Sequence, residues 1–199
     1  MKFISKQKAN KLEGHDIQDQ LLIAKVDHDY DADSDSFYGR ARGARNEHRG
    51  EAMREKDAEI LVVEDNLFCS YALISILQQY QIDCDVASNG EEAIQRVTQR
   101  RNWDGTTYKL IIMDLKLPIM DGFEASIAIR SFVEEGIEES GQVGGTVTLA
   151  QPYICLLTSN CSSEVKKKAR QIGLNEVLTK PIFKLGIQKL LFKAKLISD

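Results

Sequence analysis

Five polar side chains stand out because each follows a short apolar run at the point where that run ends. In chain order they are Glu64, Asp65, Asp114, Thr158 and Lys180. Carboxylates that lie close together repel one another, and a hard divalent cation with oxygen ligands removes that repulsion. Mg²⁺ suits a site with few carboxylates, several waters and a phosphate oxygen. The set therefore predicts a Mg²⁺ site to which a phosphoryl group can be brought.

Asp114 is the expected nucleophile of this site. A carboxylate oxygen that attacks phosphorus forms an acyl phosphate. The transfer needs a cation and a hydrogen-bond donor near the moving oxygens, and Lys180 and Thr158 are of the right types. Taken singly, the same residues are typical of an acidic turn, an exposed lysine and a capping threonine. The prediction therefore depends on a fold that brings them together.

Strand and helix patterns alternate five times from Ala58 onward. Strands are predicted over residues 59–63, 82–87, 110–113, 153–157 and 176–179. Helices are predicted to begin near Asn66, Asn89, Asp121, Ser163 and Phe183. Continuous apolar runs are typical of strands buried on both faces of a parallel sheet. The expected fold class is α/β, with a five-stranded parallel sheet covered by helices on both faces and the polar side chains at its carboxyl edge.

Two segments between these elements are predicted to be loops. Residues 102–108 are polar, and the helix that begins at Asp121 is expected to end near Phe132. Residues 134–150 are rich in glycine and glutamate and have no periodicity. The longer loop lies away from the predicted site by topology.

Residues 1–57 differ in composition from residues 58–199. They have few apolar residues and blocks of opposite charge, so they cannot bury enough apolar area to offset the entropy of ordering. We therefore expect a disordered tail or linker over 1–57 and one folded domain over 58–199. Alternating aspartates invite a calcium-loop interpretation, but a loop from Asp31 would put Ser36 at the glycine position and Arg42 at the glutamate position.

The overall composition is that of a soluble globular protein, with 43% hydrophobic residues and a net charge of −4. This charge gives no argument for binding to nucleic acid or membranes. No apolar segment approaches the ~20 residues of a membrane span. The cysteines form no CxxC pair, which favours free thiols and a cytoplasmic location. They are Cys69, Cys84, Cys155 and Cys161.

The segments ILVVEDN, LIIMDLKLPIMDG, LLTSN and LTKP occur in this order. With them, residues 58–199 resemble the receiver domains of two-component response regulators. The resemblance implies a flavodoxin-like fold with strand order 2-1-3-4-5. It also implies a phosphorelay in which a histidine kinase or histidine phosphotransfer protein phosphorylates Asp114. A receiver of this kind promotes only its own phosphorylation and dephosphorylation, so we do not expect an enzyme.

The resemblance also assigns roles to individual residues. Mg²⁺ would be held by Glu64, Asp65, Asp114 and the backbone carbonyl of Lys116. Thr158 and Lys180 would contact the phosphoryl group, and the Lys180–Pro181 peptide bond is expected to be cis.

The sequence departs from the family pattern in places. Val177 stands where an aromatic residue commonly takes part in switching, which puts that switch in doubt. Lys116 and Asn160 follow the nucleophile and the threonine by two positions, where residues tune hydrolysis in the family. We hypothesise that the Lys116 side chain lengthens the phosphorylated state.

Two arrangements fit the resemblance: a stand-alone receiver, and the receiver end of a hybrid histidine kinase. The motifs VVEDN and MDLKLPIMDG resemble those of hybrid-kinase receivers. The chain ends at Asp199, just after the last predicted helix. We therefore expect no DNA-binding domain and an output made by protein contact. The lysine-rich helix after Ser163 is either that contact surface or a solvated face. Phosphohistidine partners are expected to dock on the first predicted helix, through Phe68, Cys69 and Ala72.

A Mg²⁺-dependent phosphatase of the haloacid dehalogenase type, with an aspartate nucleophile, is the runner-up from another functional class. Such enzymes need an acidic residue two positions after the nucleophile, and here that residue is Lys116. A nucleotide-binding flavodoxin-like module is also disfavoured, because Glu64 and Asp65 occupy the turn where a glycine-rich phosphate loop is needed.

Overall fold

The computed structural model describes residues 58–142 and 150–198. The side chains of Asp104 and of residues 137–142 are not part of this description. The expectations for residues 1–57, including the tail and the calcium alternative, lie outside the described residues. The same holds for residues 143–149 of the longer predicted loop.

Five parallel strands form one sheet with the order β2-β1-β3-β4-β5. They are β1 (Ile60–Val63), β2 (Cys84–Ala87), β3 (Leu110–Asp114), β4 (Tyr153–Thr158) and β5 (Glu176–Thr179). This confirms the strand order and the α/β fold that were expected from the sequence. The observed β2 begins two residues later than predicted, because Ile82 and Asp83 precede the ladder.

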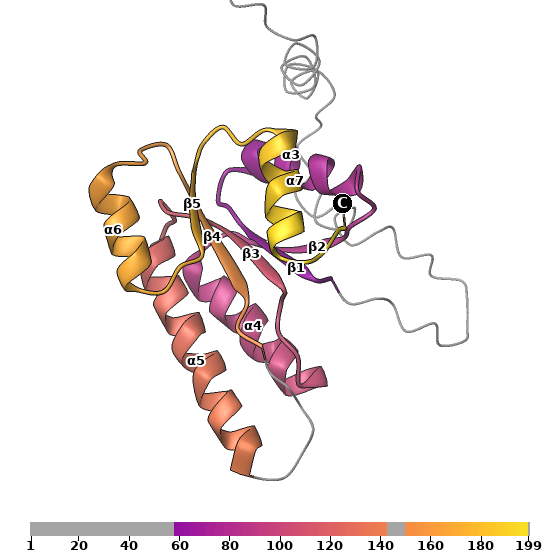
Figure 1. Ribbon diagram of the computed structural model, residues 1–199, viewed down its shortest axis with the longest axis vertical. Coiled ribbons are helices and arrows are strands. Elements are labelled where there is room, and N and C mark those ends of the chain that lie inside the picture. Colours follow the sequence, from indigo (N-terminus) through magenta and orange to yellow (C-terminus); the bar gives the residue numbers. More distant parts are fainter. Residues whose placement is uncertain (1–57, 143–149, 199) are drawn as a thin grey trace, which may run out of the picture. The chain divides into compact units, whose positions relative to one another are not determined.

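Helices cover both faces of the sheet (Figure 1). They are α3 (Leu67–Gln78), α4 (Gly90–Asp104), α5 (Gly122–Gln142), α6 (Ser163–Gln171) and α7 (Lys184–Lys193). Buried side chains of α4, α5 and α6 share one core cluster with the sheet, and those of α3 and α7 share the other. The sheet is therefore the middle of three layers.

Strand β1 shows why continuous apolar runs are needed here. Leu61 and Val63 belong to the core cluster beneath α4, α5 and α6, whereas Ile60 and Val62 belong to the cluster beneath α3 and α7. Successive side chains of a strand point to opposite faces, so a strand with a helical layer on each side must be apolar at every position.

Side-chain caps start the helices directly after the strand-end loops. The Oδ1 atom of Asn66 accepts hydrogen bonds from the backbone N–H groups of Phe68 and Cys69, at 3.0 and 3.1 Å. The Oδ1 atom of Asn89 likewise accepts from the N–H of Glu92 at 2.9 Å. An N-cap of this kind satisfies backbone donors that have no partner inside the helix. Both caps confirm the helix starts predicted from the sequence.

The two predicted loops are wrong at their beginnings, because both preceding helices run further. Helix α4 continues to Asp104 and ends at Gly105, which has a φ of 71°. Helix α5 continues beyond Phe132 to Gln142. The guanidinium of Arg101 on α4 lies over the Phe132 ring, 4.5 Å from its centroid, and its Nη1 donates to the Phe132 carbonyl oxygen at 3.1 Å.

Gly136 explains how α5 passes so close to α4. A Cβ atom at this position would collide with the guanidinium of Arg101. A glycine in the middle of a helix is normally unfavourable, and here it makes room for a cation that holds two helices together. The prediction of a loop from residue 134 onward failed because it rested on glycine and glutamate content and on missing periodicity, neither of which records this contact between helices.

Within the described ranges, no helix is both long and apolar enough to cross a membrane. All four cysteines are described and carry free thiols. Cys84 and Cys155 are buried, Cys161 is half-buried and Cys69 is exposed.

Candidate functional site

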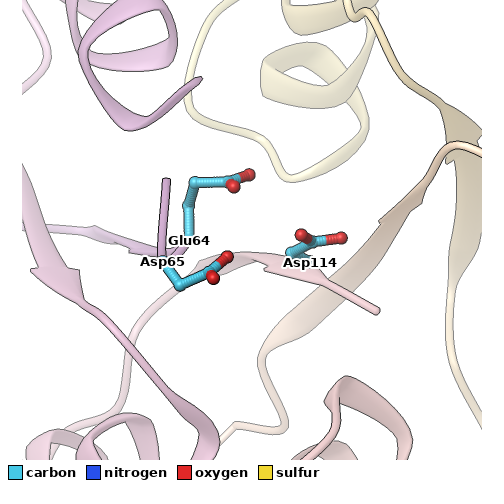
Figure 2. Close-up of side chains that lie close together, drawn as sticks. All are labelled: Glu64, Asp65 and Asp114. Atoms are coloured by element: carbon cyan, nitrogen blue, oxygen red, sulfur yellow. The ribbon is translucent and has the colours of Figure 1, made fainter. Parts of the chain in front are cut away.

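Three carboxylates from two neighbouring strands gather at the carboxyl edge of the sheet. Glu64 and Asp65 follow β1, and Asp114 is the last residue of β3. In the β1–β3 register Val63 pairs with Met113, so Glu64 and Asp114 come next at the same level. One ligand oxygen from each of the three residues lies within 4.8 Å of the others, and Figure 2 shows the carboxylates around one small space. Glu64 and Asp114 are buried, whereas Asp65 is exposed.

Lys180 joins two of these carboxylates. Its Nζ atom donates to Oε2 of Glu64 at 2.5 Å and to Oδ2 of Asp114 at 2.8 Å. Thr158 pairs with Thr179 in the β4–β5 register, so Lys180 leaves β5 at the same edge. The backbone N–H of Lys180 also donates to the carbonyl oxygen of Thr158 at 2.9 Å. Lys180, the cation predicted from the sequence, is therefore in direct contact with Asp114, the predicted nucleophile.

Burial and charge shift the pKa of Glu64 in opposite directions, and the same is true of Lys180. Burial raises the pKa of Glu64, and this effect outweighs the hydrogen bond and the attraction from Lys180. Burial by itself lowers the pKa of Lys180, but the hydrogen bonds to Asp114 and Glu64 and their negative charge raise it further than burial lowers it. Lys180 therefore stays a cation at neutral pH.

The carboxylate of Asp114 is held from both sides. Its Oδ1 atom accepts a hydrogen bond from the backbone N–H of Lys116 at 3.3 Å, and its Oδ2 atom accepts from Lys180. The N–H of Leu115 donates to the carbonyl oxygen of Leu157 at 2.8 Å, which extends the β3–β4 ladder past the nucleophile. The rotamer of Asp114 is thus fixed at a rigid strand end.

Gly122 is a site residue that the sequence had marked only as the start of a helix. A Cβ atom there would collide with the carbonyl oxygen of Asp114. Its N–H donates to the carbonyl oxygen of Leu115 at 3.0 Å and closes the β3–α5 loop. The signal in the sequence was an Asp-Gly pair just after the strand, which is typical of a tight turn but does not reveal the close approach.

Thr158 lies at the end of β4 and is buried. Its hydroxyl donates to the carbonyl oxygen of Asn160 at 3.2 Å and accepts from the N–H of Asn160 at 3.1 Å. The hydroxyl is therefore engaged by the following turn, and a bond to a phosphoryl oxygen requires it to change partner.

The other residues singled out in the sequence have the following positions. The Lys116 side chain is exposed in the β3–α5 loop. Val177 is half-buried on β5 and packs against the core cluster beneath α6. The Lys180–Pro181 peptide bond is cis, as expected. Lys168 on α6 lies over the ring of Phe123, 4.2 Å from its centroid.

The donor set fits a hard divalent cation. The acidic cluster offers oxygen ligands that are close enough to share one ion, which is what Mg²⁺ or Ca²⁺ requires. The arrangement also places the Asp114 carboxylate, the predicted nucleophile, beside the Lys180 cation. In chemical terms, this edge can accept an electrophilic, negatively charged group such as a phosphoryl.

Comparison with known proteins agrees with this geometry. Residues 60–192, more than half of the chain, match the family described as the response regulator receiver domain. The chain belongs to this family. A receiver domain is not an enzyme in the ordinary sense, which agrees with the expectation from the sequence.

Curated proteins with similar receivers are much longer than this chain. The hybrid signal transduction histidine kinase B of Dictyostelium discoideum is 36% identical over 128 residues, which are 64% of this chain and 6% of the kinase. The osmolarity two-component system protein SSK1 of Saccharomyces cerevisiae is 35% identical over 135 residues, which are 62% of this chain and 18% of SSK1. The chain thus spans less than a fifth of either relative.

Two solved receiver structures share the fold. The receiver of S. cerevisiae Ssk1, crystallised with the histidine phosphotransfer protein Ypd1, has a TM-score of 0.55 and 32% identity, over 67% of this chain and 86% of that one. The receiver of a Pseudomonas aeruginosa sensor histidine kinase, with a magnesium ion in its active-site cleft, has a TM-score of 0.51 and 27% identity, over 67% and 93% of the two chains.

Proposed function

We propose that this receiver takes a phosphoryl group from a phosphohistidine onto Asp114 and uses the acyl phosphate as a signal. The observation that carries the proposal is the position of Lys180, whose Nζ atom bridges Glu64 and Asp114 at 2.5 and 2.8 Å. A buried carboxylate with a fixed cation beside it is arranged to stabilise negative charge that moves onto it.

The transfer balances without a further reactant. A carboxylate oxygen of Asp114 attacks phosphorus, the P–N bond of the phosphohistidine breaks, and the electron pair of that bond stays on the imidazole. Lys180 stabilises the phosphoryl oxygens from one side, and Thr158 donates to them once its hydroxyl leaves Asn160. The N–H of Lys116 keeps Asp114 aligned for an in-line attack.

Mg²⁺ is the cofactor that we propose for this site. Glu64, Asp65, Asp114 and the backbone carbonyl of Lys116 would hold it. When bound, it supplies positive charge that offsets the repulsion between the carboxylates and the incoming phosphoryl group. The magnesium-bound receiver of P. aeruginosa supports this assignment.

The phosphoryl donor is a histidine kinase or a histidine phosphotransfer protein. The crystal structure of the Ssk1 receiver with Ypd1 supports this class of partner. Phe68 and Cys69 at the start of α3 are exposed, as a docking surface on this helix requires, whereas Ala72 is half-buried and less available.

The context of the receiver has two forms, a stand-alone regulator and the receiver end of a hybrid histidine kinase. Similarity to hybrid kinase B supports the second. We propose a tail or linker over residues 1–57 and a receiver domain over residues 58–199. We place the receiver in the cytoplasm, where its free thiols would stay reduced.

The test is phosphorylation of the full chain by Mg²⁺ and acetyl phosphate, followed by intact-mass spectrometry. Wild type is expected to gain the mass of one phosphoryl group, and Asp114→Asn is expected to gain none. Asp83→Asn, an exposed aspartate just before β2, is the matched control and is expected to behave as wild type. A mass gain that persists in Asp114→Asn, or no gain in wild type, contradicts the proposal.

The phosphatase alternative has its own signature. It predicts turnover of p-nitrophenyl phosphate with no accumulation of an acyl phosphate on Asp114. The residue two positions after the nucleophile is an exposed lysine, so a general acid is missing where that reaction needs one. We therefore expect no measurable turnover.

A further inference from the structure

Trp103 is the only tryptophan of the chain, and it is 91% exposed. It lies in the last turn of α4, a helix that begins after the carboxyl end of β2 and runs back to the opposite edge of the sheet. An indole is a large apolar group, and its ring face attracts cations more strongly than the rings of tyrosine and phenylalanine do. Trp103 therefore offers a surface for a contact that is separate from the acidic site.

Cations that lie over aromatic rings recur in this domain. In the described ranges four rings have one, and the pairs are Lys184 with Tyr80, Arg100 with Tyr108, Lys168 with Phe123 and Arg101 with Phe132. Trp103 has no such cation among the described residues, although its ring is the best acceptor of this contact. Arg100 and Arg101, the arginines nearest to it on α4, are already engaged. A cation for the indole therefore has to come from outside the described ranges.

Arg100 fixes the point at which the chain enters the domain, and this point lies beside Trp103. The Nη1 atom of Arg100 donates to the carbonyl oxygen of Ala58, and its Nε atom donates to the hydroxyl of Thr106 at 3.2 Å. Arg100 and Trp103 are three positions apart on α4, so their side chains are neighbours on one face, with Cβ atoms roughly 5–6 Å apart. The chain that precedes Ala58 is therefore attached next to the exposed indole.

The sequence before Ala58 supplies cations of the right type. Residues 40–57 lie outside the described residues and contain five arginines, of which Arg54 is four positions from Ala58. Four extended residues span up to roughly 13–14 Å, which is more than the separation of neighbouring side chains on a helix. A planar guanidinium stacks on an aromatic face, and arginine makes this contact more often than lysine does. The length and the chemistry of this segment therefore fit the indole of Trp103.

We propose that Trp103 is the docking site of the arginine-bearing segment of the same chain, residues 49–54, and that the guanidinium of Arg54 stacks on the indole ring. The contact is intramolecular, so the short tether to Ala58 gives it an effective concentration on the order of mM. It sets the direction from which the preceding chain approaches the receiver. The contact involves neither Asp114 nor the acidic site, so the inference is independent of the proposed function.

The first experiment uses the fluorescence of Trp103 in the full chain, because no other tryptophan contributes to the signal. Acrylamide quenches an exposed indole, and a docked segment keeps acrylamide away from it. The double variant Arg49→Gln with Arg54→Gln removes the proposed cations. Lys6→Gln with Lys8→Gln removes as many cations far from Ala58 in the sequence and is the matched control. We expect the quenching constant to rise about twofold or more in the arginine variant, because a short tether keeps the contact occupied most of the time, and to stay at the wild-type value in the control.

Limited digestion with trypsin tests the same contact from the other side. Trypsin cleaves after arginine and lysine, and an arginine that is stacked on an indole is less accessible to it. Trp103→Ser is therefore expected to speed cleavage after Arg54, followed by mass spectrometry, and to leave cleavage after Lys8 at the wild-type rate. Cleavage after Lys8 is the internal control. Circular dichroism of Trp103→Ser should match that of wild type, so that faster cleavage is not explained by a damaged fold.

Other outcomes overturn the inference in distinguishable ways. Equal quenching in wild type and in the arginine variant would show that the segment does not cover the indole. An equal rise in the lysine control would make the effect one of total charge and not of these arginines. Quenching of wild type that weakens as the protein concentration rises would assign the contact to a second copy of the chain. An unchanged rate of cleavage after Arg54 in Trp103→Ser would show that the indole does not hold this arginine.

Discussion

At the scale of single residues, Lys180 and Lys116 contact Asp114, the proposed nucleophile, in different ways. Lys180 contacts Oδ2 of Asp114 with its charged end, so it is part of the charge balance at all times. Lys116 contacts Oδ1 only through its backbone N–H, and its side chain is exposed. That side chain is free to respond to a phosphoryl group or to approaching water. We therefore hypothesise that Lys180 serves the transfer and that the Lys116 side chain sets how long the signal lasts.

Lys116→Asn tests this separation. The substitution keeps the backbone N–H that contacts Asp114 and removes the cation that, in this hypothesis, screens the phosphoryl group or crowds the attacking water. We expect the lifetime of the acyl phosphate to shorten by about threefold, a change of ~0.7 kcal/mol in the barrier to hydrolysis. The decay of the phosphorylated species, followed by mass spectrometry after removal of the phosphodonor, measures it. Lys189→Asn, on the exposed face of α7, is the control and should leave the lifetime unchanged. An unchanged or longer lifetime in Lys116→Asn would contradict the hypothesis.

At the scale of elements, the start of α4 depends on a reciprocal cap. Asn89 accepts from the N–H of Glu92, and Oε2 of Glu92 accepts in turn from the N–H and the hydroxyl of Ser88, at 2.8 and 2.9 Å. Its Oε1 atom accepts from Arg96 at 3.0 Å. Burial would raise the pKa of Glu92, but the hydrogen bonds from Ser88 and Arg96 outweigh burial and lower it. The ionised side chain thus stabilises the fold.

Glu92→Gln is expected to lower the free energy of unfolding at neutral pH by roughly 0.5–1 kcal/mol. Because the folded pKa lies below the unfolded one, this stabilisation is present above the unfolded pKa, about 4.3, and is lost as pH falls through the folded pKa. Urea unfolding of wild type and variant at pH 7 and at about pH 3 measures the difference. It should be largest at neutral pH and nearly vanish in acid. Glu91→Gln, which changes an exposed neighbour, should show little difference at either pH.

The elements also show how far the sequence could predict this fold and site. Short apolar runs and capping asparagines mark strand and helix starts by local physics, so the parallel sheet and the polar residues at the strand ends followed from them. The strand order came from the resemblance to receiver domains. The ends of α4 and α5 did not, because Arg101, Phe132 and Gly136 stabilise them by a contact between helices that has no periodic signature. Strand patterns do not record side-chain and loop geometry. They therefore could not predict the contact of Lys180 with Glu64, the turn that engages Thr158 or the positive φ of Ile119.

At the scale of the whole molecule, the acidic site opposes the stability of the fold. Three carboxylates lie within 4.8 Å in a largely buried setting, and Lys180 offsets only part of their repulsion. Sites of this kind are kept for function at some cost in stability. Any cation that binds the folded site and not the unfolded chain must then stabilise the entire domain by mass action.

Mg²⁺ should therefore raise the unfolding temperature of the full chain. At about 100 times its dissociation constant, the ion adds ~2.7 kcal/mol, which corresponds to roughly 5–10 °C for a domain of this size. Differential scanning fluorimetry with excess Mg²⁺ and with EDTA measures the shift. Asp65→Asn removes the exposed ligand and is expected to lose most of it, whereas Asp83→Asn should keep it in full. Asp114→Asn should unfold at a higher temperature than wild type in EDTA, because one of the repelling charges is gone. If Mg²⁺ raised the unfolding temperature of Asp65→Asn as much as that of wild type, the ion would bind elsewhere. The gain in stability would then not come from the acidic site.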